Sequence, residues 1–365
     1  GPETQMILDL PSYSSSSSIL QSSKLAAPEE KPPKLSRDLW PPNRINMLRE
    51  MAGTIGKAPA EAEISSMGAT SPPFVEDPAR LSDYLVSDGA QVTRPSIDPY
   101  REEIEIFSRL PGSESKDFRL AAPFFFTHLP EPTPLNVKRV FARTALAFGL
   151  LFDANQVDVS EFSPYLERLL SNGESASDEA FVLSEMKGVQ PKKIFWRIPS
   201  SRHAVSEAEA RFDSGTDISG IIVDEDDPKS DLPLELAISK LDRVLKINRL
   251  RYKIAIFAES NSIRGADDVF KILALGADSV GLGRAGLFAI GFEEGDKEII
   301  FDAPKSIIHL ENFVTALEKE IKLLSGAAGV SSLSSSLVGN RELLRSIDLS
   351  SGFRKELGVK PAGGA

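Results

Sequence analysis

Residues 254–291 decide the fold, and they read IAIFAESNSIRGADDVFKILALGADSVGLGRAGLFAIG. An apolar run over residues 253–259 ends in the polar turn Ser260-Asn261-Ser262, and an amphipathic stretch over residues 266–275 follows. Residues 276–278 then lead into a second apolar run over 279–283. This order predicts a buried strand, a helix and a second buried strand that runs parallel to the first. In β/α barrels the last two such loops commonly hold a phosphate through backbone N–H groups.

The same alternation extends backwards to about residue 118. The predicted strands cover residues 120–127, 149–155, 180–186, 193–198, 218–224, 253–259 and 279–283, and the predicted helices cover 135–148, 164–170, 204–212, 233–247 and 266–275. Buried strands separated by helices indicate either a closed barrel or a doubly wound sheet. We predict a TIM-type (β/α)8 barrel. Because only seven strands are recognised where the barrel needs eight, one βα unit is either degenerate or merged with its neighbour.

The chain divides into five segments by composition. Residues 1–37 are a Ser- and Pro-rich tail that we expect to be disordered. Residues 38–117, with one helix over 43–51, form an N-terminal extension wrapped on the barrel of residues 118–292. Residues 293–350 form a C-terminal helical cap, with helices over 306–324 and 340–346, and residues 351–365 form a flexible tail.

Composition limits the classes of function. The net charge of −11 argues against a nucleic-acid partner. The chain has no cysteine, which rules out disulfides, a cysteine nucleophile and iron–sulfur clusters held by cysteine. Without a secretory signal or an apolar run of about 18 residues, a membrane span is not expected. We therefore expect a cytoplasmic protein.

The decisive stretch resembles the last two βα units of the FMN-dependent barrel domain of glutamate synthase. The matching residues are Ser260, Ile263, Arg264, the run Leu273-Ala274-Leu275-Gly276-Ala277-Asp278, Val280, Gly283, Ala285, Leu287, Ala289 and Gly291. Residues 94–103 look like the stretch that precedes the first barrel strand in that family, and residues 311–333 look like the helix and cap that follow the barrel. The likeness covers about residues 43–348 in the family's order. It implies a barrel of FMN-binding ancestry.

The resemblance also implies a cofactor site. The residues that would hold FMN are Ser260, Asn261, Ser262, Ile263, Arg264, Gly283, Arg284 and Arg197. Several of them depart from the family: Asn261 and Ser262 replace paired glycines, Arg284 replaces a small polar residue, and Arg197 stands where a lysine faces the flavin. For Arg264 the alternatives are a phosphate contact and a salt bridge.

Other departures affect the chemistry. Residues 224–227 place four carboxylates where the family has a glycine-rich segment, and such a cluster disfavours an anionic flavin. The cluster is interpreted as a solvated loop, a cation site or a patch for a basic partner. The cysteines of the family's iron–sulfur cluster are missing, with Phe292 at the first of their positions.

His128 is the single candidate for an acid or base, because it follows the first strand at the end where barrels place active sites. Its alternative is a packing or loop residue. We expect His203 near a helix start and His309 on a helix surface, and no spacing of ligands predicts a metal site. Residues 124–126, all phenylalanine, and Trp196 are expected in the core.

Three functions remain in view. The first is a catalytically degenerate relative of the glutamate synthase FMN domain, with FMN weakly bound or lacking, that acts as a subunit or scaffold with a protein partner or as a homo-oligomer. The second is an active FMN-dependent oxidoreductase of the glutamate synthase type. The third is a flavin-free barrel that binds a phosphorylated metabolite at the same loops.

Overall fold

The computed structural model describes most of the chain beyond residue 32. The described residues are 33–36, 38–56, 77–111, 119–153, 156–157, 168–172, 180–185, 193–213, 218–292 and 302–363. The predicted N-terminal tail lies outside them, except for residues 33–36.

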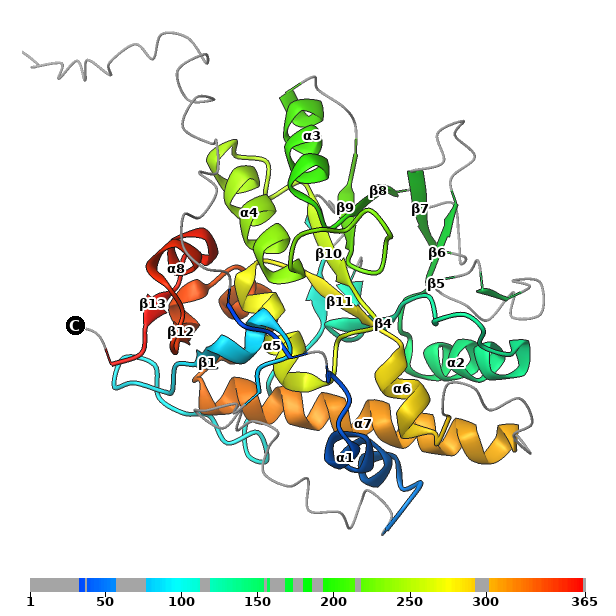
Figure 1. Cartoon of the computed structure of the whole chain (residues 1–365). Helices are drawn as coiled ribbons and strands as arrows, with labels where there is room; N and C mark the ends of the chain where they lie inside the picture. The colour runs from blue at the N-terminus through cyan, green and yellow to red at the C-terminus, as the bar shows by residue number, and fades with distance from the viewer. Residues whose placement is uncertain are drawn as a thin grey trace, which may run out of the picture. The chain divides into compact units, whose positions relative to one another are not determined.

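Eight strands close into a barrel, as the sequence predicts (Figure 1). They are β4 (Phe124–Phe126), β5 (Phe152–Asp153), β6 (Arg168–Asn172), β7 (Ala180–Glu185), β8 (Lys193–Pro199), β9 (Gly220–Asp224), β10 (Ala255–Glu259) and β11 (Ser279–Leu282). The barrel closes where β11 pairs in parallel with β4, through Val280 opposite Phe124. The closed barrel, and not the doubly wound sheet, is therefore the fold.

The barrel departs from a regular (β/α)8 pattern at β7, which runs antiparallel to both β6 and β8. Strand β6 lies where the sequence predicted a helix over residues 164–170, so that prediction is wrong for residues 168–170. Its short apolar pair, Leu169-Leu170, fits either a helix or a strand by periodicity alone. A parallel crossover needs about a dozen residues, and the connecting residues 173–179 are too few for one.

Four of the predicted helices form on the outside of the barrel. They are α2 (Leu135–Phe148), α3 (Arg202–Asp213), α4 (Leu234–Ile247) and α5 (Ala266–Leu275), and the short α6 (Arg284–Ala289) follows β11. Helix α5 ends at Gly276, whose φ of 136° is a conformation that other residues rarely adopt. A Cβ there would also lie 2.3 Å from the Cβ of Asp242 on α4.

Alternation along the strands separates the inside of the barrel from its outside. Phe125, Phe195 and Phe257 are buried in the cluster inside the barrel. The ring of Phe257 contacts the rings of both Phe125 and Phe195. Phe124 and Phe126 belong to the outer core between strands and helices. The prediction that residues 124–126 are core is confirmed. Three aromatic rings fill the barrel's interior, so it is a packed core and not a pore.

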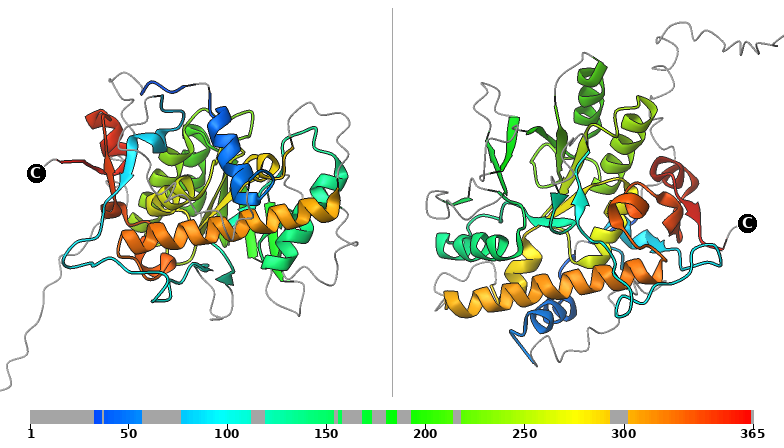
Figure 2. Two further views of the ribbon diagram at one scale, coloured as in Figure 1. Left: turned by 90° about the horizontal axis from the view of Figure 1, so that it is seen from below. Right: turned by 180° about the vertical axis from the view of Figure 1, so that it is seen from behind.

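The N-terminal extension and the C-terminal cap pack on the barrel's helices. Helix α1 (Pro42–Ala52) crosses the long helix α7 (Ala303–Ala327) and also contacts α6 (Figure 2). Strand β1 (Leu85–Ser87) pairs with β12 (Leu344–Ser346), which pairs with β13 (Lys360–Pro361). The hairpin of β2 (Ser108–Arg109) and β3 (Arg119–Leu120) brings Leu110 and Leu120 into the cluster inside the barrel.

Two predictions for the C-terminal region are wrong. The helix predicted over residues 340–346 is a single 3-10 turn, Arg341–Leu343, that runs into β12. The predicted flexible tail contains helix α8 (Ser351–Leu357) and β13. Glycines flank this helix and suggested disorder, but Phe353 and Leu357 are buried and Gly358 ends the helix with a φ of 72°. Among the described residues, none of the helices has the length and apolar character that a membrane crossing needs.

Candidate functional site

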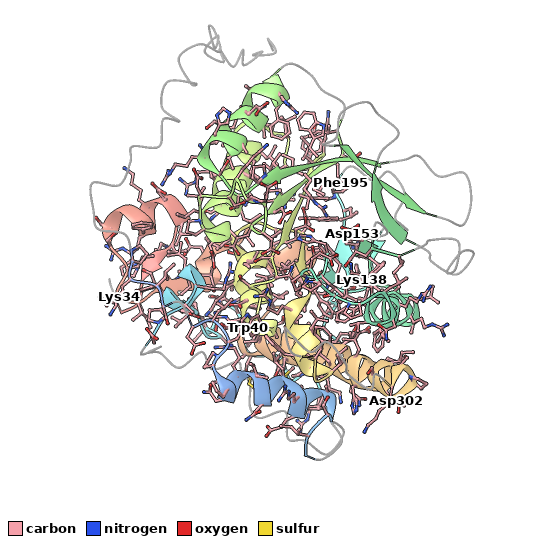
Figure 3. The ribbon with its side chains drawn as sticks, turned by 45° about the vertical axis from the view of Figure 1, so that its right-hand side comes forward. Lys34, Trp40, Lys138, Asp153, Phe195 and Asp302 are labelled. Atoms are coloured by element: carbon pink, nitrogen blue, oxygen red, sulfur yellow. The ribbon has the colours of Figure 1, made fainter. Side chains whose placement is uncertain are left out.

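Five polar side chains point into the barrel at the carboxyl ends of its strands. Because Phe125, Phe195 and Phe257 point inward, the residues two positions further along each strand point inward as well. We call the resulting set the mouth layer: Thr127, Asp153, Arg197, Asp224 and Glu259. Figure 3 shows Asp153 on the same side of the fold as Phe195, whose strand β8 carries Arg197. This is the end of the barrel where active sites lie.

Arg197 is held by carboxylates of the chain itself. Its Nε lies 2.6 Å from Glu259 Oε1, and its Nη2 lies 3.1 Å from Glu259 Oε2 and 3.3 Å from Asp153 Oδ2. The hydroxyl of Thr127 donates to Glu259 Oε2 over 2.7 Å. Burial lowers the pKa of Arg197, but the charges of Glu259 and Asp153 outweigh it and raise that pKa overall. Arg197 is therefore a paired cation.

Asp224 is the least compensated acid of the mouth layer. Burial raises its pKa to about 7, and the charge of Glu259 adds to this effect while His128 and Arg197 oppose it. Its Oδ1 accepts a hydrogen bond from the backbone N–H of Asp226 over 2.8 Å. Asp224 can therefore carry a proton near neutral pH.

His128 lies at the edge of the mouth layer, partly exposed. Its Nδ1 is 3.1 Å from Thr127 Oγ1, and its Nε2 is 3.6 Å from Asp226 Oδ2. One ligand atom each from His128, Asp224 and Glu259 lie within 4.8 Å of one another, a spacing that suits a metal ion. The guanidinium of Arg197 already contacts both oxygens of Glu259, and its charge would repel such a cation.

The loops after β10 and β11 are joined through Asn261. Its backbone N–H and its Nδ2 both donate to Asp226 Oδ2, over 2.7 and 3.0 Å, and Nδ2 also donates to the carbonyl of His128 over 2.9 Å. Its Oδ1 accepts from the backbone N–H of Arg284 over 3.0 Å. A Cβ on Gly283 would lie 2.5 Å from the same Oδ1, so the Asn261 side chain packs directly on this glycine. Four loops therefore meet at one residue.

The remaining predicted cofactor ligands lie in different surroundings. Ser260 is buried, and its Oγ accepts from the backbone N–H of Ser262 over 2.9 Å. Ile263 is fully buried in the outer core. Arg264 is buried between two acids, with its Nε 2.9 Å from Asp268 Oδ2 and its Nη1 2.8 Å from Asp83 Oδ2. Burial would raise the pKa of Asp268, but the Arg264 guanidinium holds it well below its usual range.

The structure thus brings Ser260, Asn261, Ser262, Gly283 and Arg284 together, with Arg197 in the adjacent mouth layer. Arg264 forms the salt bridge that was its alternative interpretation. Binding of FMN by any of these residues stays a prediction. As they are arranged here they do not fit the phosphate of FMN, because the backbone N–H groups of Asn261 and Arg284 already donate to side-chain oxygens of the chain.

The acidic segment is only in part the solvated loop that the sequence suggested, because Asp226 is exposed whereas Asp224 is buried. Asp224 is 7% exposed, and Glu225 is bound by Arg80, whose Nη1 lies 2.7 Å from Glu225 Oε2. The Nε of the same guanidinium donates to Glu235 over 3.2 Å. Arg80 comes from the N-terminal extension and carries no motif, so sequence reasoning missed it.

Sequence reasoning also missed most of the mouth layer, although a signal for it exists. Three apolar strands each end in an acid: LLFD at Asp153, IIVD at Asp224, the first of four consecutive acids, and IAIFAE at Glu259. In parallel strands these ends meet at one edge, so acids at the ends of three strands predict a shared cluster. Their counterion, Arg197, lies near the end of its own strand, directly before Ile198.

Two regions of the chain match glutamate synthase families. Residues 44–118 match the glutamate synthase central domain, and residues 215–295 match the conserved region in glutamate synthase. These two regions of the chain are therefore similar to glutamate synthase domains. The second region contains β9, β10, β11 and the loops that follow them, so the match includes Asp224, Asp226, Glu259, Asn261 and Arg284 of the site described above.

Curated relatives carry the same family name. The archaeal glutamate synthase [NADPH] of Methanocaldococcus jannaschii is 37% identical over 149 residues, which cover 36% of this chain and 29% of the relative. The archaeal-type enzyme of Thermotoga neapolitana is 34% identical over 151 residues, covering 37% and 29%. The chain therefore aligns with less than a third of the length of these relatives.

Solved structures give more distant matches. A mutant flavocytochrome b2 with benzoylformate has a TM-score of 0.49 at 13% identity, covering 90% of this chain and 96% of that one. A soluble mutant of the membrane-associated (S)-mandelate dehydrogenase from Pseudomonas putida has a TM-score of 0.48 at 14% identity, covering 83% and 99%. The family assignment rests on the sequence matches and not on these structures.

Proposed function

We propose that this glutamate synthase-like barrel is catalytically inactive, does not retain FMN, and acts as a subunit or scaffold of a larger complex. The observation that carries the proposal is the ion pairing of Arg197 with Glu259 and Asp153. Arg197 is the only cation of the mouth layer, and it is the residue that the family resemblance would place against the flavin. In this chain it stabilises two buried carboxylates instead.

Charge supports the same conclusion. The mouth layer sets three acids, Asp153, Asp224 and Glu259, against one guanidinium. A phosphate-bearing flavin adds negative charge, and its reduced form adds more, so the electrostatic free energy of binding becomes less favourable. Freeing Arg197 for a ligand would leave Glu259, which is fully buried, without its counterion. Such a loss typically costs about 3–5 kcal/mol.

The scaffold part of the proposal follows from the pairing within the mouth layer. Arg197 is engaged by Glu259 and Asp153, so the mouth layer does not offer its cation to a flavin, whereas the outer surface of the barrel can still contact another protein. We therefore propose a protein partner that carries the redox chemistry.

The rival function is an FMN-dependent oxidoreductase, and the names of the relatives favour it. For this function, the side chains of Asp226 and Asn261 would have to move away from the backbone N–H groups of Asn261 and Arg284 that they now occupy. The third function, binding of another phosphorylated metabolite, requires the same movement without the flavin.

The test is retention of FMN by the purified chain. We expect a colourless protein that, after incubation with excess FMN and gel filtration, carries no visible flavin band and shows no rise in Tm. A retained flavin band with glutamate synthase activity would overturn the proposal in favour of the oxidoreductase. A rise in Tm with other phosphate monoesters, but not with FMN, would favour the third function.

The partner is tested in extracts of the source organism. We expect the chain to elute at a mass well above its own 39.7 kDa and together with a flavin-containing protein. Deleting its gene should lower the activity of that complex without removing its flavin. Elution of the chain alone at its own mass would contradict the scaffold role.

A further inference from the structure

We propose that Asp226 and Asn261 form an intramolecular plug in an anion site, and that removing the plug uncovers a site for inorganic phosphate. The inference rests on the proposed function, because it explains how a barrel of this family excludes FMN. It adds that the backbone of the ancestral anion site is intact and that two side chains occupy it.

The first argument is the identity of the donors. Asn261 follows β10 and Arg284 follows β11, and these neighbouring parallel strands place both backbone N–H groups at the carboxyl end of the barrel. Backbone N–H groups that converge from two such loops form an anion-binding concavity. In this chain both groups donate to side-chain oxygens, over 2.7 and 3.0 Å.

The second argument is the charge of the occupant. Asp226 Oδ2 accepts two hydrogen bonds from Asn261, one from the backbone and one from the side chain, and lies 3.6 Å from His128 Nε2. A carboxylate with these partners makes the contacts that a phosphate oxygen would make, with charge-assisted hydrogen bonds. The side chain of Asp226 is about one quarter exposed, so this acid is not held in place by burial.

The third argument is space. Asn261 is 5% exposed, and its Oδ1 lies where a Cβ of Gly283 would come within 2.5 Å. Because Gly283 has no side chain, there is space over the loop after β11, and the side chain of Asn261 occupies this space. A glycine at position 261 would reopen this space and leave the N–H of Arg284 without its acceptor.

The experiment compares the purified wild-type chain with the double variant Asp226→Ala/Asn261→Gly. The probe is inorganic phosphate, with chloride at equal ionic strength as the reference, and the readouts are Tm and the width of the phosphate ³¹P resonance. Asp227→Ala is the matched control, because it removes the same charge from the next residue, whose carboxylate accepts from the N–H of Lys229 over 2.8 Å.

We expect phosphate to raise the Tm of the double variant by about 2 °C or more and to broaden its ³¹P resonance, with no effect on the wild type or Asp227→Ala. If the double variant does not fold, Asn261→Gly alone removes the side chain that packs on Gly283 and releases the N–H of Arg284, and it should show a smaller rise that is still specific to phosphate. Folded variants that ignore phosphate would overturn the plug. That result leaves the proposed function standing, whereas FMN retained by the wild type would overturn the proposed function itself.

Discussion

At the scale of single residues, the charged side chains of the mouth layer pair with one another, and they would otherwise be available to a ligand. Arg197 contacts Glu259 and Asp153, so Arg197→Ala would leave two buried carboxylates uncompensated. We expect this variant to lose about 3–5 kcal/mol of unfolding free energy, measured by urea denaturation. Lys360→Ala is the control, because its pair with Glu342 is mostly exposed and should contribute about 0–1 kcal/mol. Equal losses in the two variants would contradict the buried network.

Asp224 gives a pH dependence of known sign. Its pKa in the folded chain is about 7, above the unfolded value of about 3.9. A raised folded pKa favours folding while the group is protonated, so this contribution is present at acid pH and is lost as pH rises through about 7. Asp224→Asn keeps the acceptor for the Asp226 N–H and removes the titration. We expect its stability relative to the wild type to increase from pH 5 to pH 8, and an unchanged difference would contradict the shift.

At the scale of elements, the sequence predicted correctly the helices and strands whose apolar pattern is long and whose ends carry their own signals. Helices α2 and α5 were predicted to the residue, because each combines an apolar stripe with a glycine that ends it at a positive φ. The prediction for strand β6 was wrong because an apolar run of two residues shows no periodicity. The antiparallel pairing of β6 also depends on β7. The sequence named the loops after β10 and β11 as a candidate site, but it did not indicate the contact between Asp226 and Asn261, because Asp226 lies in a loop 35 residues away in the chain.

The 3-10 turn Leu81–Tyr84 is one of the elements that tie the N-terminal extension to the barrel. Asp83 on this turn pairs with Arg264, and Ser82 donates to Asp268 at the start of α5 over 3.0 Å. Asp83→Ala should cost about 1–3 kcal/mol, less than a full ion pair, because Arg264 keeps Asp268. We expect amide hydrogen exchange over residues 79–87 to accelerate more than exchange in α5. Equal acceleration in both would contradict a local tie.

At the scale of the whole described chain, a sheet that the sequence did not predict links the N-terminal extension to the C-terminal region. Strand β12 pairs with β1 from the extension and with β13 from the C-terminal end. Helix α8 lies between them in the chain and packs on α4 of the barrel, where Arg243 donates to the carbonyl of Glu356 over 2.6 Å. These contacts make the C-terminal segment part of one cooperative unit.

Truncation tests that unit. Ending the chain after Leu349 removes Phe353 and Leu357, both buried, together with β13. Loss of two large apolar side chains costs several kcal/mol (roughly 2–5 for each), so we expect a Tm drop of well over 5 °C in calorimetry. Ending after Gly363 keeps these residues, together with the hydrogen bond from the N–H of Ala362 to the carbonyl of Ser346, and should leave Tm unchanged. Because β12 would lose a neighbour, exchange should also accelerate in β1, which lies across β12 from the deleted strand. A truncated chain with an unchanged Tm would mean that the segment folds as an appendage and that the barrel's stability does not depend on its cap.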